Sequence, residues 1–359
     1  MAKSGQHGGN VLQMAEKFDL DPAKVIDFSA NINPLGIPPQ VRDAIISQLD
    51  CLQHYPDIEY RQLHQSIAAH HHCSPLSVVA GNGATEMIFL WAQHVKPQKA
   101  LLIEPSFAEY RRALSRVGCV IDNYVLREED GFAVTEHVLD ALHRDLDCLF
   151  ICTPNNPTGL IPDAELLQAI IKRCQQLDIR LFVDESFIDF MPGRPSLSQC
   201  LADNPHLYVL RSLTKFYALP GLRLGYLLSS DHRLLAEIRD EREPWTINAL
   251  AALAGEILFE DDSYCQATYQ WLTQEQVYLQ TELAQFKQLQ LFEPSANYLL
   301  FKHLSTNSSL QSELMQHGIL IRSCANYIGL SDAFYRVAIK SHQDNQRLIE
   351  ALQMVFAHG

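Results

Sequence analysis

The chain has no long apolar segment and no recognisable export signal. None of its uninterrupted apolar runs is long enough to span a bilayer. Residues 1–10 are polar and rich in glycine, and they contain no apolar core of the kind found in signal peptides. We therefore expect a cytoplasmic protein with no membrane partner.

Positive charge is also scarce. The 359 residues include 28 Lys and Arg against 42 Asp and Glu, which gives a formal net charge of -14 at pH 7. Nucleic acids and anionic membranes select proteins with basic surfaces, because their phosphate groups are negatively charged. The charge balance therefore argues against nucleic acid and against anionic membranes as partners.

The cysteines follow no pattern. Nine are scattered along the chain without a Cys-x-x-Cys pair, and such a set favours reduced thiols in the cytoplasm over a disulfide framework. The run 70–73, His-His-His-Cys, raises the alternative of a metal site. Adjacent side chains on a helix point in different directions, and no partner motif is present. We therefore favour the end of a surface helix and expect no metal.

Apolar residues, by contrast, are plentiful. They make up 47% of the sequence, enough for a large core and, at this length, for two domains. Short apolar runs predict strands at 78–80, 100–103, 120–125, 146–152, 180–183, 207–210 and 224–228, and stretches with helical spacing, such as 164–174, lie between several of them. Strands that alternate with helices favour parallel pairing. We therefore predict an α/β fold whose large domain has a mostly parallel seven-stranded sheet.

The rest of the chain predicts a smaller α+β domain. Helices at about 39–49 and 60–72 are expected before the strands of the large domain. After those strands we expect one long helical region at 247–286, strands near 298–301, 319–321 and 334–338, and a terminal helix. We expect the N-terminal segment, 1–37, to join this smaller domain. The predicted large domain is 38–250 and the predicted small domain is 251–359.

The most informative stretch is 211–225, which follows the apolar run at 207–210. Ser212, Thr214 and Arg223 can hold a phosphate through charge-assisted hydrogen bonds. Lys215 is flanked by Leu, Phe, Tyr and Ala, and desolvation would lower the pKa of its amine and leave more of it nucleophilic. A Schiff-base cofactor such as pyridoxal phosphate requires a phosphate cradle beside such an amine. Alone, the stretch is equally compatible with a basic surface loop.

Further motifs lie at the carboxyl ends of predicted strands, where open α/β sheets bind ligands. The turn 81–85 can cradle a phosphate with backbone N–H groups, although such turns are common. The turn 153–159 is made rigid by two prolines and can present an amide to a ligand. Asp184 ends a strand, where a buried carboxylate needs a partner such as a pyridinium N–H, a helix cap or a salt bridge. Arg322 and Arg336 can bind carboxylate or phosphate, or form structural ion pairs.

The order of these motifs is specific. The chain contains, in this order, a Gly-rich turn, an Asn-Asn-Pro turn, Asp, Ser-x-Thr-Lys, Arg and a late Arg. In this order it resembles the fold type I, aspartate-aminotransferase-like pyridoxal-phosphate enzymes. It is similar to the branch that holds histidinol-phosphate aminotransferases and, closer still, to the threonine-phosphate decarboxylases of cobalamin biosynthesis. The resemblance covers nearly the whole chain. It rests on residues 7–10, 28–36, 152–159, 211–217 and 321–327, of which the first and last favour the decarboxylases.

The resemblance implies a site for pyridoxal 5'-phosphate. Lys215 would hold it covalently and Asp184 would pair with its pyridine nitrogen, so these are the expected catalytic residues. The other expected cofactor-binding residues are Gly83, Ala84, Thr85, Phe107, Tyr110, Asn156, Ser212, Thr214, Arg223 and Tyr55. Either Phe107 or Tyr110 would stack on the ring. Tyr55 would reach the cofactor of a neighbouring subunit, which implies a homodimer.

The resemblance also implies a phosphoamino-acid substrate, bound by His7, Gly8, Asn31, Asn156, Arg322 and Arg336. One departure from the aminotransferases is Phe187, where they usually have a Tyr that donates to the cofactor's phenolic oxygen. The implied reaction is decarboxylation of O-phospho-L-threonine to (R)-1-amino-2-propanol O-2-phosphate for cobalamin biosynthesis. The alternatives are a histidinol-phosphate aminotransferase and a non-catalytic binding protein on the same fold.

Overall fold

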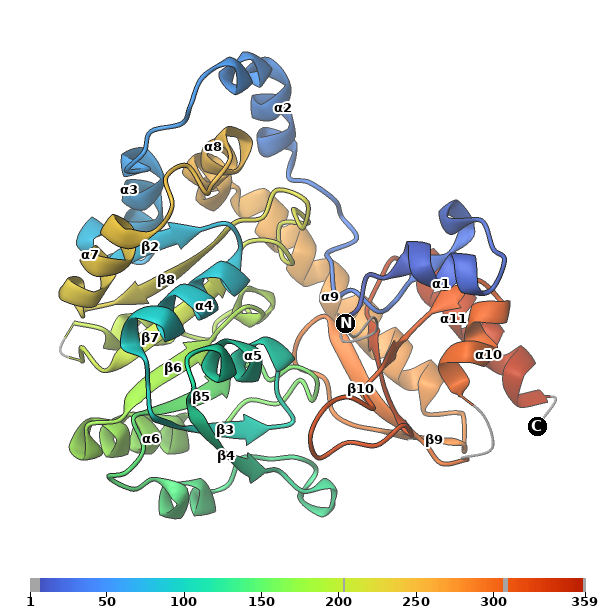
Figure 1. Ribbon diagram of the computed structural model, residues 1–359. Coiled ribbons are helices and arrows are strands. Elements are labelled where there is room, and N and C mark those ends of the chain that lie inside the picture. The colour runs from blue at the N-terminus through green and yellow to red at the C-terminus, as the bar shows by residue number, and fades with distance from the viewer. Residues whose placement is uncertain (1–6, 203, 306–308, 358–359) are drawn as a thin grey trace.

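Two sheet regions lie side by side in the protein (Figure 1). The computed structural model describes residues 7–202, 204–305 and 309–357. One region is built around a seven-stranded sheet and the other around a four-stranded sheet. The long helix α9 (Asp262–Leu283) runs from the first region toward the second.

The large sheet is mostly parallel. Its strand order is β2 (Val78–Gly81), β8 (Gly225–Ser229), β7 (Leu207–Ser212), β6 (Arg180–Asp184), β5 (Cys148–Cys152), β3 (Lys99–Glu104) and β4 (Val120–Val125). Only β8 runs antiparallel to its two neighbours. Strands β5, β7 and β8 are buried along their whole length. Helices cover both faces of the sheet, and this explains why these strands are apolar runs in the sequence. The predicted seven-stranded, mostly parallel sheet is confirmed.

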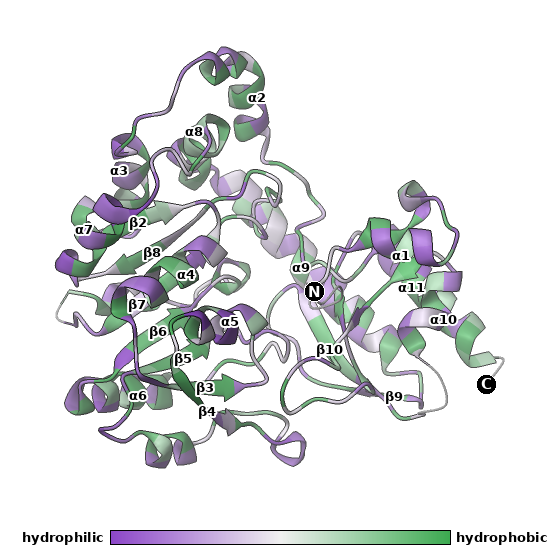
Figure 2. Ribbon diagram, viewed as in Figure 1, coloured by the Kyte–Doolittle hydropathy of each residue, from purple (hydrophilic) through white to green (hydrophobic). Residues whose placement is uncertain are grey.

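Helices cover both faces of this sheet (Figure 2). On one face, helices α4 (Ala84–Val95), α5 (Ala108–Arg116) and α7 (His232–Glu241) share an apolar cluster with alternate strand residues. Trp91 of α4 is its centre, with its ring 5.2–5.5 Å from those of Phe150, Phe182 and Tyr208. Helix α6 (Ala164–Leu177) packs on the other face, where Ile170 joins the cluster that contains Leu149 and Leu181.

The N-terminal segment pairs with the C-terminal part of the chain. After α1 (Val11–Lys17), strand β1 (Ile26–Asp27) lies parallel to β11 (Ile319–Leu320). The four-stranded sheet has the order β12 (Arg322–Ser323), β13 (Phe334–Ala338), β10 (Tyr298–His303) and β9 (Leu289–Leu291), and α10 (Leu310–Gln316) and α11 (His342–Ala357) complete this region. The domain boundaries at 37/38 and 250/251 stay predictions.

The helical region predicted as one piece at 247–286 consists of two helices. These are α8 (Ala249–Ile257) and α9, and a short 3₁₀ turn separates them. The reason is a cap: Asp261 Oδ1 accepts a hydrogen bond from the Tyr264 backbone N–H at 3.0 Å, which starts a new helix. Helices α2 (Pro39–Ser47) and α3 (Arg61–His70) lie near their predicted positions.

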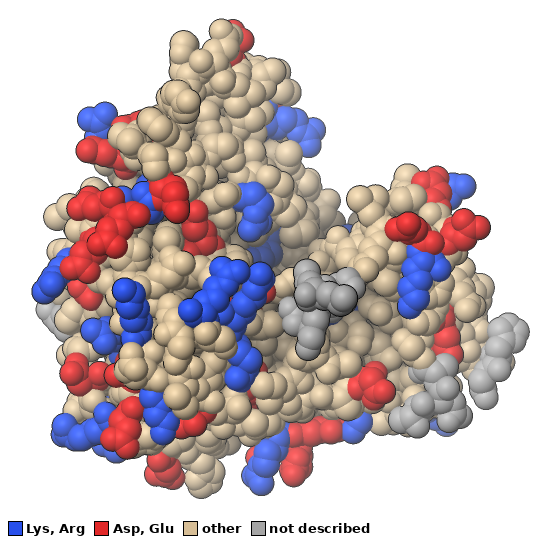
Figure 3. All heavy atoms as spheres, in the orientation of Figure 1, with Lys and Arg blue, Asp and Glu red and all other residues tan. Residues whose placement is uncertain are grey.

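Several 3₁₀ helices connect these elements: η1 (Pro22–Lys24), η2 (Leu49–Gln53), η3 (Pro75–Ser77), η4 (Glu128–Asp130), η5 (Glu136–Ala141), η6 (Ile188–Phe190), η7 (Leu197–Cys200) and η8 (Leu258–Glu260). Within the described ranges, no helix is long and apolar enough to cross a membrane. The same residues contain no group of His, Cys, Asp and Glu side chains that could hold a metal ion. Acidic and basic side chains intermix on the face shown in Figure 3.

Candidate active site

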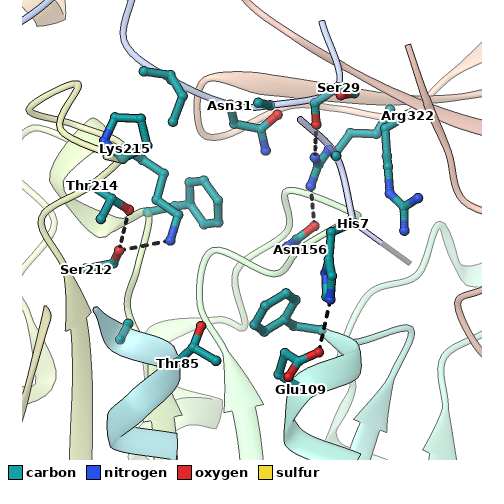
Figure 4. A pocket seen from close by; sticks show the side chains of 18 of the residues that line it. His7, Ser29, Asn31, Thr85, Glu109, Asn156, Ser212, Thr214, Lys215 and Arg322 are labelled. Carbon is teal, nitrogen blue, oxygen red and sulfur yellow. Dashed lines mark hydrogen bonds and ion pairs between the residues drawn. The ribbon is translucent and has the colours of Figure 1, made fainter. Parts of the chain in front are cut away.

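A cavity of about 520 Å³ lies where the carboxyl ends of the large sheet's strands face the smaller region (Figure 4). Its wall is built from both sheet regions and from the N-terminal segment. The lining residues are His7, Gly8, Ser29, Ala30, Asn31, Ile32, Ala84, Thr85, Phe107, Glu109, Arg112, Asn156, Phe187, Ser212, Thr214, Lys215, Pro220, Arg223, Arg322, Tyr327 and Arg336. Thirteen sequence-predicted site residues are thus brought together, although the chain separates the first from the last by most of its length.

Lys215 lies in the loop that follows β7. Its Nζ donates to Ser212 Oγ at 2.9 Å, and Ser212 Oγ is in turn 2.9 Å from Thr214 Oγ1 (Figure 4). The amine is 5.4 Å from the centre of the Phe187 ring. Although part of the side chain faces the cavity, crowding desolvates the amine and lowers the pKa of Lys215, an effect that nearby Asp184 partly opposes. The amine is therefore suited to act as a nucleophile.

Asp184 lies behind the wall, at the end of β6. Its Oδ2 accepts a hydrogen bond of 2.5 Å from the Tyr110 hydroxyl, and its Oδ1 accepts one of 2.8 Å from the Ser186 N–H. Burial raises the pKa of Tyr110 well above its ordinary value, and the Asp184 charge adds to the rise, so the phenol stays a neutral donor. A buried carboxylate is thus held as an acceptor close to Lys215.

The N-terminus of α4 forms one corner of the cavity. Gly83 is its N-cap, with φ 85°, and a Cβ there would lie 2.5 Å from Arg223 Nη2. Only glycine therefore allows the guanidinium to approach the first turn of the helix. Arg223 itself has φ 61°, a strained conformation for a residue with a side chain. With Ser212 and Thr214, this corner presents an arginine, hydroxyls and backbone N–H groups to an anion.

The opposite side carries Arg336, on β13, and Asn156, in the turn after β5. Arg336 donates through Nη2 to the Ser29 carbonyl at 2.8 Å and through Nη1 to Asn156 Oδ1. Asn156 Oδ1 also accepts from the Tyr327 hydroxyl at 3.2 Å. Because both bonds go to Oδ1, the amide nitrogen of Asn156 is the atom that can donate to a ligand. Arg322, on β12, is equally buried and donates to Asn326 Oδ1 at 2.6 Å.

The N-terminal segment contributes His7 and Gly8 to the cavity wall. His7 Nε2 lies 3.0 Å from Glu109 Oε1, and its ring centre lies 5.7 Å from that of Phe107. At Gly8, a Cβ would lie 2.1 Å from the Ser29 carbonyl oxygen, so this close approach requires glycine. The next N–H, of Gly9, donates to Ser29 Oγ at 2.8 Å.

Four predicted residues do not line the cavity. Gly83 and Asp184 support lining residues from behind. Tyr110 is fully buried beneath the wall, whereas Phe107 lines the cavity, so of the two aromatic candidates we favour Phe107 as the ring-stacking residue. Tyr55 is 79% exposed and packs on Trp245, with ring centres 4.5 Å apart. Its predicted contact with a neighbouring subunit stays a prediction.

Some lining residues carried no signal in the sequence. Glu109 and Arg112 lie on α5, where charged residues are ordinary on a helix surface, and Ser29 lies within the matched stretch 28–36 without a distinguishing neighbour. Tyr327, by contrast, could have been identified from the sequence, because it ends the stretch 321–327 on which the resemblance rests.

Comparison with known proteins agrees with this geometry. The family described as aminotransferase class I and II matches residues 23–352. The chain belongs to this family. Membership confirms the predicted fold type I architecture. It also confirms that the protein is an enzyme and that its cofactor is pyridoxal phosphate.

Three relatives place the chain within the aminotransferase family. The threonine-phosphate decarboxylase of Salmonella typhimurium is 51% identical, over 97% of this chain and 96% of the relative. The adenosylcobalamin biosynthesis bifunctional protein CobDQ of Leptospira interrogans is 32% identical, over 98% of this chain and 41% of that protein. Among solved structures, the histidinol-phosphate aminotransferase from Clostridium acetobutylicum has a TM-score of 0.86 and 32% identity, covering 92% of this chain and 99% of that one.

The cavity of this aminotransferase-family chain fits pyridoxal phosphate. The α4 corner suits its phosphate, Lys215 suits its aldehyde, and Asp184 suits its ring nitrogen. Two buried polar atoms on lining residues, Asn31 Oδ1 and Arg336 Nε, have no hydrogen-bond partner among the described residues. Such unsatisfied atoms are typical of a site shaped around a bound molecule.

Proposed function

We propose that the protein decarboxylates O-phospho-L-threonine to (R)-1-amino-2-propanol O-2-phosphate, as a step of cobalamin biosynthesis. The observation that carries this proposal is the position of Lys215 opposite a wall with two buried arginines, Arg322 and Arg336, and His7. A substrate with both a carboxylate and a phosphate needs cationic or N–H partners for two anionic groups. The similarity to the Salmonella decarboxylase and to the Leptospira protein supports the same substrate and pathway.

Pyridoxal phosphate, when bound, supplies an electron-accepting ring that stabilises the charge left on the substrate when carbon dioxide departs. In our proposal the α4 corner, with Gly83, Ala84, Thr85, Ser212, Thr214 and Arg223, holds its phosphate, while Asn156 and Phe107 contact its ring. Asp184, held by Tyr110, pairs with its nitrogen. Lys215 holds it covalently between turnovers.

The chain's own residues orient the substrate and move its proton. Arg336, with Asn31 and Asn156, is proposed to bind the carboxylate region, while Arg322, His7 and the Gly8 N–H bind the phosphate. Holding both anionic groups would fix the orientation of the α-carbon, and so would favour loss of the carboxylate over loss of the hydrogen. Lys215 Nζ lines the cavity, and its lowered pKa makes its protonated form a stronger acid, so Lys215 is the group suited to donate the proton that replaces the lost carboxylate.

The alternative is a histidinol-phosphate aminotransferase, which the similarity to the Clostridium structure favours. Phe187 weighs against it. The Phe187 side chain lines the cavity beside Lys215, and a phenyl ring cannot donate the hydrogen bond that a Tyr would supply there. A non-catalytic protein would have no need of a desolvated Lys215 beside a buried Asp184.

A homodimer is part of the proposal. Tyr55 and Trp245 form an exposed aromatic pair, and Ile46, Leu49 and Leu52 nearby in the chain are also more than half exposed. Apolar side chains exposed in this way mark a surface that another protein covers. We propose that a second copy covers it and that Tyr55 then reaches the partner's cofactor phosphate.

Substrate selection tests the proposal. Arg322→Ala should lower kcat/KM for phosphothreonine by about 30-fold or more relative to free threonine, because losing a contact with a buried charge costs about 2–5 kcal/mol. Arg347→Ala is the control, since Arg347 is exposed and pairs with Glu350 on the surface of α11. An equal loss with both substrates would contradict a phosphate-binding role, and no activity of the wild type with phosphothreonine would contradict the function.

A further inference from the structure

A buried carboxylate lies at the mouth of the cavity without a role in the proposed chemistry. Glu109, in the first turn of α5, is 3% exposed. Its Oε1 is 3.0 Å from His7 Nε2 (Figure 4), and its Oε2 accepts from Arg112 Nη1 at 3.1 Å. Burying a carboxylate is costly unless it is paired, and these two contacts supply the pairing.

The Glu109 contact bridges the two sides of the cavity. The N-terminal segment that carries His7 is attached to the smaller region through Gly8 and Gly9, which pack on and bond to Ser29. Helix α5, by contrast, belongs to the large sheet region. Glu109 thus fixes the His7 ring against the large region, while the backbone of the same segment is fixed against the small one.

The charge of Glu109 runs against the rest of the wall. The cavity is lined by Arg112, Lys215, Arg223, Arg322 and Arg336, which attract anions, whereas the Glu109 carboxylate repels the anionic groups of a substrate even though it pairs with Arg112. Glu109 therefore weakens the binding of an anionic substrate by repulsion, unless its contact with His7 strengthens that binding by more.

The geometry points to Glu109 as a positioning residue that prepares His7 to bind the substrate phosphate. This inference rests on the proposed function and deepens it. A carboxylate can only accept, so it fixes Nε2 as an N–H nitrogen and leaves Nδ1 for the ligand. Nδ1 donates to a phosphate oxygen when both ring nitrogens carry hydrogen, and an acceptor oxygen beside Nε2 is compatible with that form of the ring. Glu109 therefore holds the His7 ring in one orientation for the phosphate without touching the substrate itself.

The test compares Glu109→Gln with a matched control, Glu104→Gln. Glu104 is also 3% exposed and also pairs with an α5 arginine, Arg111, at 2.9 Å, but it has no contact with His7. In the holoenzyme, Glu109→Gln should raise KM for phosphothreonine about fivefold to tenfold, because a charge-assisted bond is roughly twice as strong as a neutral one. Its kcat should change less than twofold, because Arg322 and the Gly8 N–H would still hold the phosphate in position. Glu104→Gln should change neither constant.

A double-mutant cycle with His7→Ala separates positioning from a structural role. If Glu109 acts through His7, Glu109→Gln should change KM less than twofold once His7 is absent. The same rise of KM in the presence and absence of His7, or a lower KM for Glu109→Gln alone, would overturn the inference. Thermal melting should show comparable destabilisation for Glu109→Gln and Glu104→Gln, since both remove a buried charge that pairs with an arginine.

Binding of inorganic phosphate to the holoenzyme, measured by calorimetry, keeps this inference distinct from the proposed function. Phosphate should bind about fivefold to tenfold more weakly to Glu109→Gln than to the wild type and to Glu104→Gln, whichever phosphorylated amine is the natural substrate. If this holds while the wild type fails to decarboxylate phosphothreonine, the proposed function is wrong and the role of Glu109 stands. Equal phosphate affinity in the three proteins would overturn the role of Glu109 even if phosphothreonine is decarboxylated.

Discussion

Tyr110→Phe removes one hydrogen-bond donor to Asp184 in the candidate active site. The substitution removes only the hydroxyl that donates to Asp184 Oδ2 at 2.5 Å, and it leaves the Ser186 N–H on Oδ1 at 2.8 Å. The phenyl ring keeps the apolar contacts of a fully buried side chain, so no large cavity forms. The variant therefore tests how much the protein depends on the hydrogen bond from Tyr110 to Asp184.

The expected loss follows from the chemistry of that bond. A hydrogen bond to a charged acceptor contributes about 1.5–3 kcal/mol, which corresponds to roughly 10- to 150-fold. Because Asp184 serves both cofactor binding and turnover in our proposal, the loss should divide between them. The product of kcat and the association constant for pyridoxal phosphate should fall by about 10- to 150-fold.

Tyr208→Phe is the matched control for this measurement. Tyr208 is also fully buried in the same apolar cluster, and its hydroxyl donates to Asp231 Oδ2 at 2.6 Å, away from the cavity. Both variants should lose a comparable amount of thermal stability, but Tyr208→Phe should keep its kcat and its cofactor affinity. Equal kinetic effects of the two substitutions, or none from Tyr110→Phe, would refute the role assigned to Asp184 and Tyr110.

Three further predictions concern other parts of the molecule. Phe187→Tyr should raise the ratio of keto acid to carbon dioxide formed from phosphothreonine, because it restores the missing donor beside Lys215; an unchanged ratio would show that this position does not direct the reaction. His64, buried with a pKa lowered by desolvation to about 3, should make the protein less stable as pH falls below 6.5, since the unfolded chain takes up the proton first. The loss between pH 6.5 and 5 should be on the order of 2 kcal/mol in denaturant titrations and smaller in His64→Gln, and an identical pH slope would contradict it. Tyr55→Ala and Lys215→Ala subunits, each inactive, should regain activity when mixed, if Tyr55 serves the partner's site.

The large sheet could be predicted because its signal is local. Each buried strand is an apolar run, and the run predicted at 180–183 differs from the observed Arg180–Asp184 by one residue. The two-residue strand Arg322–Ser323 has no such run and forms only through pairing with β13. The break between α8 and α9 depends on one capping carboxylate, Asp261, within a continuous helical pattern.

The cofactor side of the site could be predicted for the same reason. Ser212, Thr214 and Lys215 are close in sequence, and the order of the other motifs along the chain distinguishes this turn from a basic surface loop. The pairing of His7 with Glu109 joins residues 102 positions apart, and nothing near either one indicates the other. Likewise, the sequence could not show that Phe107, just before α5, lines the cavity while Tyr110, on α5, is buried in the cluster against the sheet.

Product analysis with phosphothreonine tests the central claim most directly. Purified holoenzyme, incubated with O-phospho-L-threonine labelled at its carboxyl carbon, should release labelled carbon dioxide and one equivalent of 1-amino-2-propanol phosphate, with no need for 2-oxoglutarate. Lys215→Ala should release neither product. Retention of the label in a keto acid, together with rapid transamination of histidinol phosphate by the wild type, would contradict the decarboxylase and identify an aminotransferase instead.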